Sequence, residues 1–157
     1  MSDKEYSPAE LETFSKLEAE GWERVNVAEG FTGHVGPYWL KYSDHGVTVG
    51  LVVAARHTNN HLGTIHGGIV MSFADIGLGM GVVQSMGEKA RNCVTTSLNT
   101  QFVSVAKVGE FITIEPEVVR SGRHLVFVRG LIKTPEKSIA SVEGIWKLLE
   151  GELRVSS

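Results

Sequence analysis

The sequence predicts a single α+β domain, residues 1–157, in which an antiparallel β-sheet wraps around one long central helix. The first observation is an apolar stretch from Gly67 to about Gln84, long enough for about five helical turns. The second is a series of strand-like segments on both sides of this stretch, separated by polar turns. The third is the length of 157 residues, which suits one hydrophobic core.

The first predicted element is a short amphipathic helix within an N-terminal extension, residues 1–30. Residues 7–10 form a capping box with Pro8 at the first helical position, and Gly21 is a plausible end. Apolar residues recur on one face of this helix: Leu11, Phe14 and Leu17. We expect this face to cover another part of the protein. Residues 22–37 are rich in glycine and give no clear assignment.

The predicted core, residues 44–148, consists mainly of strands around the apolar helix. The segments with strand composition are 38–42, 47–55, 94–103, 111–120, 125–133 and 139–149. Pro116 within the fourth segment predicts an edge or a bulge at that point. The glycines at positions 77, 79 and 81 lie inside the helix, so we interpret them as sites of close helix–sheet packing and not as a nucleotide-binding loop.

Composition and charge exclude several classes of protein. The content of 42% hydrophobic and 21% charged residues is ordinary for a globular domain. The net charge of −3 argues against a nucleic-acid partner, which requires a basic field. Asp75 in the middle of the apolar helix argues against a membrane span. A single cysteine, Cys93, and a charged N-terminus without an apolar core predict a cytoplasmic protein.

The loop at residues 57–68 and the helix after it carry the most informative chemistry. A Gly67-Gly68 pair at a helix start leaves amide hydrogens uncovered, which suits an anion or a developing oxyanion. Tight turns alone would also explain these glycines. Asp75 lies among apolar neighbours with no cation within one helical turn. We interpret it as a general base or nucleophile, while a structural hydrogen-bonding role remains the alternative.

The spacing of Gly67 and Asp75 adds a geometric constraint. Eight residues correspond to about 12 Å of helix rise. One reacting carbonyl has to lie about 3 Å from both the oxyanion donor and the base. A single helix cannot easily present both groups, but two antiparallel helices can. If both residues are catalytic, we therefore expect a site between two protomers.

The run from Asn60 to Gly68, followed by Asp75, resembles the hotdog-fold acyl-CoA thioesterases, in particular the phenylacetate-degradation branch. The resemblance covers about residues 44–148. It implies that Asp75 is the active-site carboxylate, Gly67 the oxyanion amide and Asn60 a residue that positions the thioester or water. It also implies that Thr95, on the strand after the helix, supplies a hydroxyl that holds the substrate carbonyl or the water. It further implies a homodimer joined at the sheet edges, usually doubled to a tetramer. In such a dimer the Asn60 and Gly67 positions of one chain face the Asp75 and Thr95 positions of the other.

Two positions depart from the family pattern. Val105 replaces a common proline, which affects a turn and leaves the chemistry intact. Thr95 stands where a mammalian relative has serine, so the hydroxyl is kept and a methyl group is added.

Several other residues have weaker functional interpretations. His66 is expected to brace the loop, and with Gly68 it is assigned to substrate binding. Arg123 is our best candidate for a contact with CoA phosphates, ahead of three other basic residues: Arg91, Arg120 and Lys133. His57 and His61 lack an acidic third ligand at a standard offset, so no metal is expected. Cys93 has no obvious base beside it and is interpreted as an inert thiol.

The predicted function is hydrolysis of an acyl- or aryl-CoA thioester to a carboxylic acid and free CoA. No cofactor is expected, because CoA enters as part of the substrate. Met71, Phe73, Met80 and Val83 are expected to form the acyl pocket. Two alternatives remain open, a non-catalytic acyl-CoA-binding module and a hotdog enoyl-CoA hydratase or dehydratase. The second would pair a histidine with the carboxylate, and His66 is the nearest candidate.

Overall fold

The computed structural model describes residues 6–25, 30–59, 62–87 and 92–149. Its helices are α1 (Pro8–Ala19), α2 (Gly30–Val35), the 3₁₀ helix η2 (Ala55–His57) and α3 (Gly67–Ser85). Its strands are β1 (Glu23–Val25), β2 (Tyr38–Ser43), β3 (Gly46–Val52), β4 (Cys93–Phe102), β5 (Phe111–Ile114), β6 (Glu117–Ser121), β7 (Leu125–Lys133) and β8 (Ser138–Leu148).

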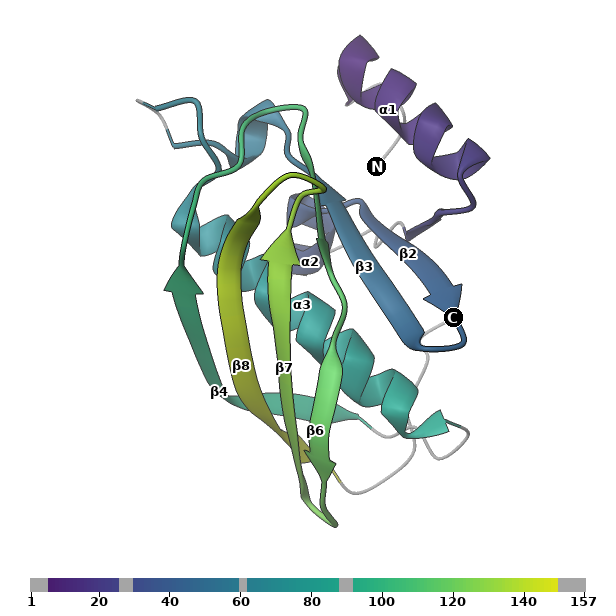
Figure 1. Ribbon diagram of the computed structural model, residues 1–157, viewed down its shortest axis with the longest axis vertical. Helices are drawn as coiled ribbons and strands as arrows, with labels where there is room; N and C mark the ends of the chain where they lie inside the picture. The colour runs from purple at the N-terminus through teal and green to yellow at the C-terminus, as the bar shows by residue number, and fades with distance from the viewer. Residues whose placement is uncertain (1–5, 26–29, 60–61, 88–91, 150–157) are drawn as a thin grey trace.

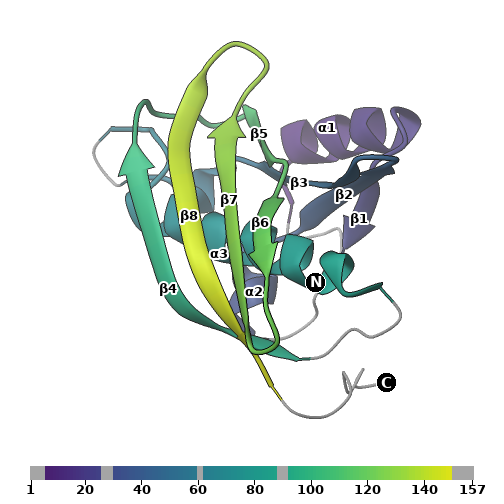
Figure 2. The same cartoon turned by 60° about the horizontal axis from the view of Figure 1, so that its bottom comes forward.

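The strands of the described residues form one antiparallel sheet in the order β1-β2-β3-β5-β7-β8-β4, and β6 pairs with β7 beside β5. Figure 1 shows α3 crossing behind β8, β7 and β6, and Figure 2 shows the same strands curving over the helix. The predicted fold class, a hotdog-type antiparallel sheet around a long helix, is confirmed.

Helix α3 is the centre of the main hydrophobic core. Its buried face carries the large side chains Phe73 and Leu78 against the sheet. A Cβ atom at Gly77 would overlap the Ile114 side chain, and one at Gly81 would overlap Pro116. The glycines therefore allow β5 and Pro116 to approach the helix closely, as predicted. This helix is long and apolar enough to cross a membrane, but the sheet covers it as a core helix.

Helix α1 lies against the opposite face of the sheet, over β2 and β3 (Figures 1 and 2). It begins with the predicted capping box, in which Glu10 N donates to Ser7 Oγ at 3.3 Å and Ser7 N donates to Glu10 Oε2 at 2.9 Å. A second, smaller core forms beneath it from buried apolar residues: Tyr6, Phe14, Leu17, Trp39 and Val52. The expectation that this helix covers another part of the protein is confirmed.

Two stretches differ from the sequence expectations. The unassigned segment 22–37 contains β1 and α2 within its described residues. The expected continuous strand 111–120 was wrong, because it divides at Pro116 into β5 and β6. Proline has no amide hydrogen for the ladder. The two halves consequently pair with different parts of β7, Thr113 with Lys133 and Glu117 with Arg129.

Candidate functional site

Asp75 and Thr95 form a direct pair between the central helix and the sheet. Asp75 lies half-buried in the middle of α3, and Thr95 lies near the start of β4. Thr95 Oγ1 donates a hydrogen bond to Asp75 Oδ1 at 2.5 Å. This length lies at the short end of hydroxyl-to-carboxylate bonds, about 2.5–2.7 Å. The bond uses one carboxylate oxygen and leaves lone pairs on Oδ2 for another donor.

Strand β4 explains how Thr95 reaches the helix. It pairs with β8 on one side and, among the described strands, has no partner on its other edge. Its register shifts between Thr95, opposite Trp146, and Ser97, opposite Ile145. A bulge of this kind inserts one residue and re-aims the neighbouring side chains. The local irregularity thus lies beside Thr95, whose side chain donates to Asp75.

A cavity of about 800 Å³ lies next to this pair. Asp75 and Thr95 contribute polar atoms to its wall, which is otherwise mainly apolar. The apolar lining includes Leu40, Val47, Ile76, Met80, Val83 and Trp146. A cavity of this size and polarity suits a small organic group held in a fixed orientation.

Two of the four residues that we expected to form an acyl pocket line this cavity. Met80 and Val83 line the cavity, as expected. Phe73 instead faces the core with no exposed surface, and Met71 lies exposed on another face of the helix. The cavity is lined along α3 by residues 76, 79, 80, 83 and 84, which share one face of the helix because of their spacing.

The start of α3 presents one amide without a protein acceptor among the described residues. His66 is the N-cap residue, and Gly68 N donates to His66 Nδ1 at 2.9 Å. Ile69 N and Val70 N both donate to the carbonyl of His66. Gly67 N has no such acceptor in the described part of the chain. The structural hydrogen bonding that we predicted for His66 is confirmed. Its side chain accepts from the amide of Gly68 and not from that of Gly67.

The free amide and the carboxylate are far apart within one chain. Helix α3 is continuous from Gly67 to Ser85. Asp75 follows Gly67 by eight positions, which gives about 12 Å of helix rise. The ring of Phe102, at the other end of β4 from Thr95, lies beside Gly67. One protomer thus carries the two groups at opposite ends of its exposed β4 edge.

The remaining predicted residues are less constrained. Asn60, His61 and Arg91 lie outside the described residues. Arg123 is exposed in the turn between β6 and β7 and has no ion pair with the described residues. Lys133 forms an ion pair with Glu115 at 3.0 Å, which reduces its suitability for phosphate contact. In the described part of the chain, no three His, Cys, Asp or Glu side chains cluster as metal ligands.

Asp75 has two titratable neighbours along the cavity. Burial and the negative charge of Asp75 raise the pKa of Tyr38 to about 12. The same two causes raise the pKa of the Cys93 thiol above its ordinary value, which disfavours a nucleophilic thiolate. The Tyr38 hydroxyl is buried and has no hydrogen-bond partner among the described residues. Sequence reasoning missed Tyr38, because nothing in its strand-like segment indicates that it faces a carboxylate on α3.

The comparisons agree with this architecture. The thioesterase superfamily model matches residues 62–140. A provisionally named esterase of Pseudomonas aeruginosa is 30% identical over 79% of this chain and 98% of its own length. Mouse acyl-coenzyme A thioesterase 13 is 33% identical over 48% of this chain and 51% of its own.

A solved structure extends the similarity to the whole fold. Zebrafish thioesterase superfamily member 2 has a TM-score of 0.69 and 26% identity, covering 88% of this chain and 98% of the zebrafish chain. The resemblance inferred from the loop and Asp75 is confirmed. The chain belongs to the thioesterase superfamily.

Proposed function

We propose that this protein hydrolyses acyl-CoA thioesters to a carboxylic acid and free CoA. The observation that carries the proposal is the Thr95–Asp75 hydrogen bond on the wall of an apolar cavity of about 800 Å³. A thioester needs an apolar space for its acyl group, a base for water and a donor for the carbonyl oxygen. The mouse relative is named for this reaction.

Asp75 acts as the general base in this proposal. Thr95 donates to Oδ1 and fixes the orientation of the carboxylate, so that Oδ2 accepts a proton from the attacking water. The water oxygen bonds to the thioester carbon, and the carbonyl oxygen becomes an oxyanion. Collapse of this intermediate breaks the carbon–sulfur bond and releases CoA as a thiol once the sulfur is protonated.

The Gly67 amide stabilises the oxyanion. Its hydrogen is free of protein acceptors among the described residues, and it lies at the positive end of the α3 dipole. Since Gly67 and Asp75 lie about 12 Å apart along one helix, we propose that Gly67 of one protomer faces Asp75 and Thr95 of another. The family resemblance assigns Asn60 to the Gly67 side of this site. The exposed edge of β4 between these two ends is the surface through which we propose that the dimer forms.

The two ends of the substrate meet different surfaces. The acyl group enters the apolar cavity along α3, where Met80 and Val83 form part of the wall. The CoA phosphates stay at the surface, where Arg123 is exposed and is the basic residue that we assign to them. His66 keeps its structural role as the N-cap.

The two alternatives differ in products. A binding module would retain acyl-CoA unchanged, and a hydratase or dehydratase would change the absorbance of an enoyl-CoA without releasing a thiol. His66 Nδ1 accepts from the Gly68 amide, which makes it a poor proton-transfer partner for Asp75. A panel of acyl-, aryl- and enoyl-CoA thioesters should give free thiol with at least one member. Binding without thiol release across the panel would contradict the proposal.

A further inference from the structure

The residue before Gly67 is hydrogen-bonded to His57, which lies outside the proposed site. His66 N donates to His57 O at 2.8 Å. The carbonyl of His66 in turn accepts from Ile69 N at 2.9 Å and from Val70 N at 3.2 Å. The first turn of α3 is therefore attached to the body of the protein through the backbone of His57.

His57 and His66 close the base of a narrow hairpin. Within it, Thr58 pairs with Ile65 as an antiparallel bridge, and Asn59 N donates to Thr64 O at 2.8 Å. Ile65 N also donates to Ala106 O at 2.8 Å. The arm that leads into α3 is therefore held on one side by the segment that begins at His57 and on the other by the segment at Ala106 and Lys107.

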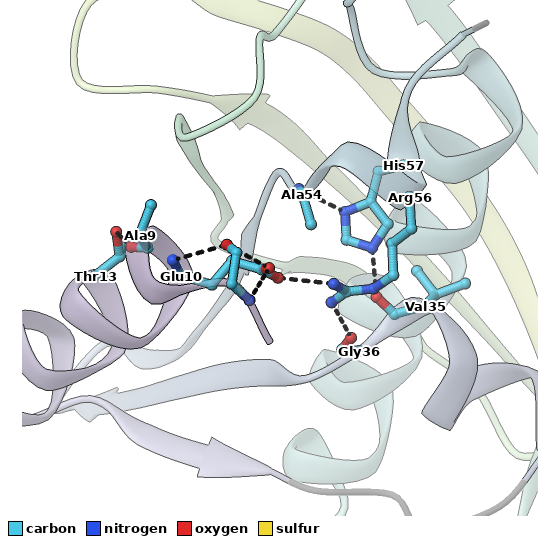
Figure 3. Close-up of polar contacts among 9 residues, drawn as sticks. Ala9, Glu10, Thr13, Val35, Gly36, Ala54, Arg56 and His57 are labelled. Atoms are coloured by element: carbon cyan, nitrogen blue, oxygen red, sulfur yellow. Dashed lines mark hydrogen bonds and ion pairs between the residues drawn. The ribbon is translucent and has the colours of Figure 1, made fainter. Parts of the chain in front are cut away.

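The imidazole of His57 holds this base against α2. The residue is 1% exposed. As Figure 3 shows, Ala54 N donates to Nδ1 at 3.1 Å, and Nε2 lies 2.9 Å from Val35 O. Since Nδ1 is an acceptor, Nε2 carries the hydrogen and donates it to the carbonyl. Burial and the neighbouring Arg56 cation lower the pKa of His57 to about 4, so the ring stays neutral near pH 7.

Arg56 fixes the same short 3₁₀ helix to the N-terminal helix (Figure 3). Its Nη1 donates to Glu10 Oε1 at 2.7 Å, and its Nη2 donates to Gly36 O at 2.8 Å. Glu10 uses its other carboxylate oxygen in the capping box of α1. The guanidinium and imidazole of two consecutive residues thus attach α1 and α2 to the start of the hairpin.

We propose that His57 is a positioning residue for the oxyanion-binding amide of Gly67, acting through the backbone of His66. The inference rests on the proposed function for its kinetic consequence, but the structural link from His57 to α3 is independent of the reaction. The imidazole touches no substrate and moves no proton. Its two hydrogen bonds hold the hairpin base where the Gly67 amide meets the carbonyl oxygen.

The test separates the two hydrogen bonds of the ring. Both amide side chains carry an acceptor and a donor, but they differ in length. His57→Asn places its Oδ1 near the position of Nδ1 for Ala54 N and is too short to reach Val35 O, whereas His57→Gln places its Nε2 near the position of the ring Nε2 for Val35 O and has no acceptor at the Nδ1 position. We expect each variant to lower kcat roughly 10- to 100-fold, which is at most the effect of removing an oxyanion donor. The KM of each variant should stay within about twofold of the wild-type value. His45→Gln, an exposed histidine, is the matched control and should keep both constants.

A second measurement does not depend on activity. In ¹H–¹⁵N NMR spectra of folded His57→Asn and His57→Gln, the Gly67 and Gly68 amides should shift and exchange faster, while the indole of Trp146 should not change. If the wild type releases no thiol, the proposed function fails and this readout alone decides the inference. Unaltered Gly67 and Gly68 amides, or an unaltered kcat in an active enzyme, would overturn it.

Discussion

The hydroxyl of Thr95 on β4 donates to the carboxylate of Asp75 on α3 at 2.5 Å, across the boundary between sheet and helix. The bond orients a carboxylate that has no ion pair among the described residues. It also places that carboxylate on the wall of the cavity and leaves Oδ2 available to water.

The substitution Asp75→Asn should remove the base and keep the shape. The amide oxygen of the new side chain still accepts from Thr95, so the variant should fold and assemble like the wild type. Turnover should fall roughly 10²–10⁴-fold, the usual contribution of a general acid–base group. Thiol release from the best acyl-CoA of the panel measures it, with circular dichroism as the folding control. Hydrolysis at the wild-type rate would show that Asp75 is not the base.

Substitutions of Thr95 should separate the hydroxyl from the methyl group. Thr95→Ser keeps the donor to Asp75 and should retain most activity. Thr95→Val keeps the size and loses the donor, so its kcat should fall well below that of the serine variant. Equal turnover of the two variants would mean that Thr95 contributes only β-propensity to its strand.

The cavity predicts a selective effect on acyl length. Val83→Trp places a large ring into the cavity wall and should raise KM for long acyl chains by roughly tenfold or more, while short acyl chains still fit. Val119→Trp changes an exposed residue of β6 away from this cavity and is the matched control. A uniform change across all chain lengths would place the acyl group elsewhere.

The sequence alone predicts the fold better than it predicts the contacts of the site. The glycine-started apolar helix and the alternating strands follow from local periodicity, so α3 and most strands were expected. The Thr95–Asp75 contact joins residues twenty positions apart and depends on a bulge in β4, which no local pattern encodes. The resemblance to a family placed Thr95 and Asp75 on the same side of the site, but the hydrogen bond between them is shown only by the structure.

Two residues show why the rest was missed. Tyr38 lies in a strand-like segment, and its place beside Asp75 depends on how β2 curves over α3. His57 was considered with His61 as a possible metal ligand, whereas its ring bonds Ala54 N and Val35 O in the interior. Burial of a histidine between two backbone groups is a tertiary property, so a loop-like sequence gives no signal of it.

The buried imidazole of His57 predicts how stability depends on pH. The pKa of the His57 ring is about 6.5 in the unfolded chain, but burial and the neighbouring Arg56 lower it to about 4 in the folded protein. Between these values the unfolded state binds more protons, so this contribution to stability is present above pH 6.5 and is lost as pH falls toward 4. The free energy of unfolding should decline by about 3 kcal/mol over this window.

Urea titrations at pH 7, 6, 5 and 4, followed by tryptophan fluorescence, measure this decline. His57→Gln has no titrating ring and should show a much flatter dependence, whatever its stability at pH 7. His45→Gln should keep the wild-type slope, since His45 is exposed. If His57→Gln keeps the full decline, another group is responsible for it.

Mixed dimers test whether two chains share one site. Asp75→Asn damages the carboxylate side, and Asn60→Ala damages the loop side. Each homodimer then has two damaged sites, but a mixed dimer has one site with both lesions and one with neither. With random pairing about half of the dimers are mixed, so roughly a quarter of wild-type activity should return on subunit exchange if the sites act independently.

Differently tagged chains allow the mixed dimers to be purified and verified. Without recovery above the two parents in such dimers, Gly67 and Asp75, about 12 Å apart along α3, cannot both act on one carbonyl as proposed.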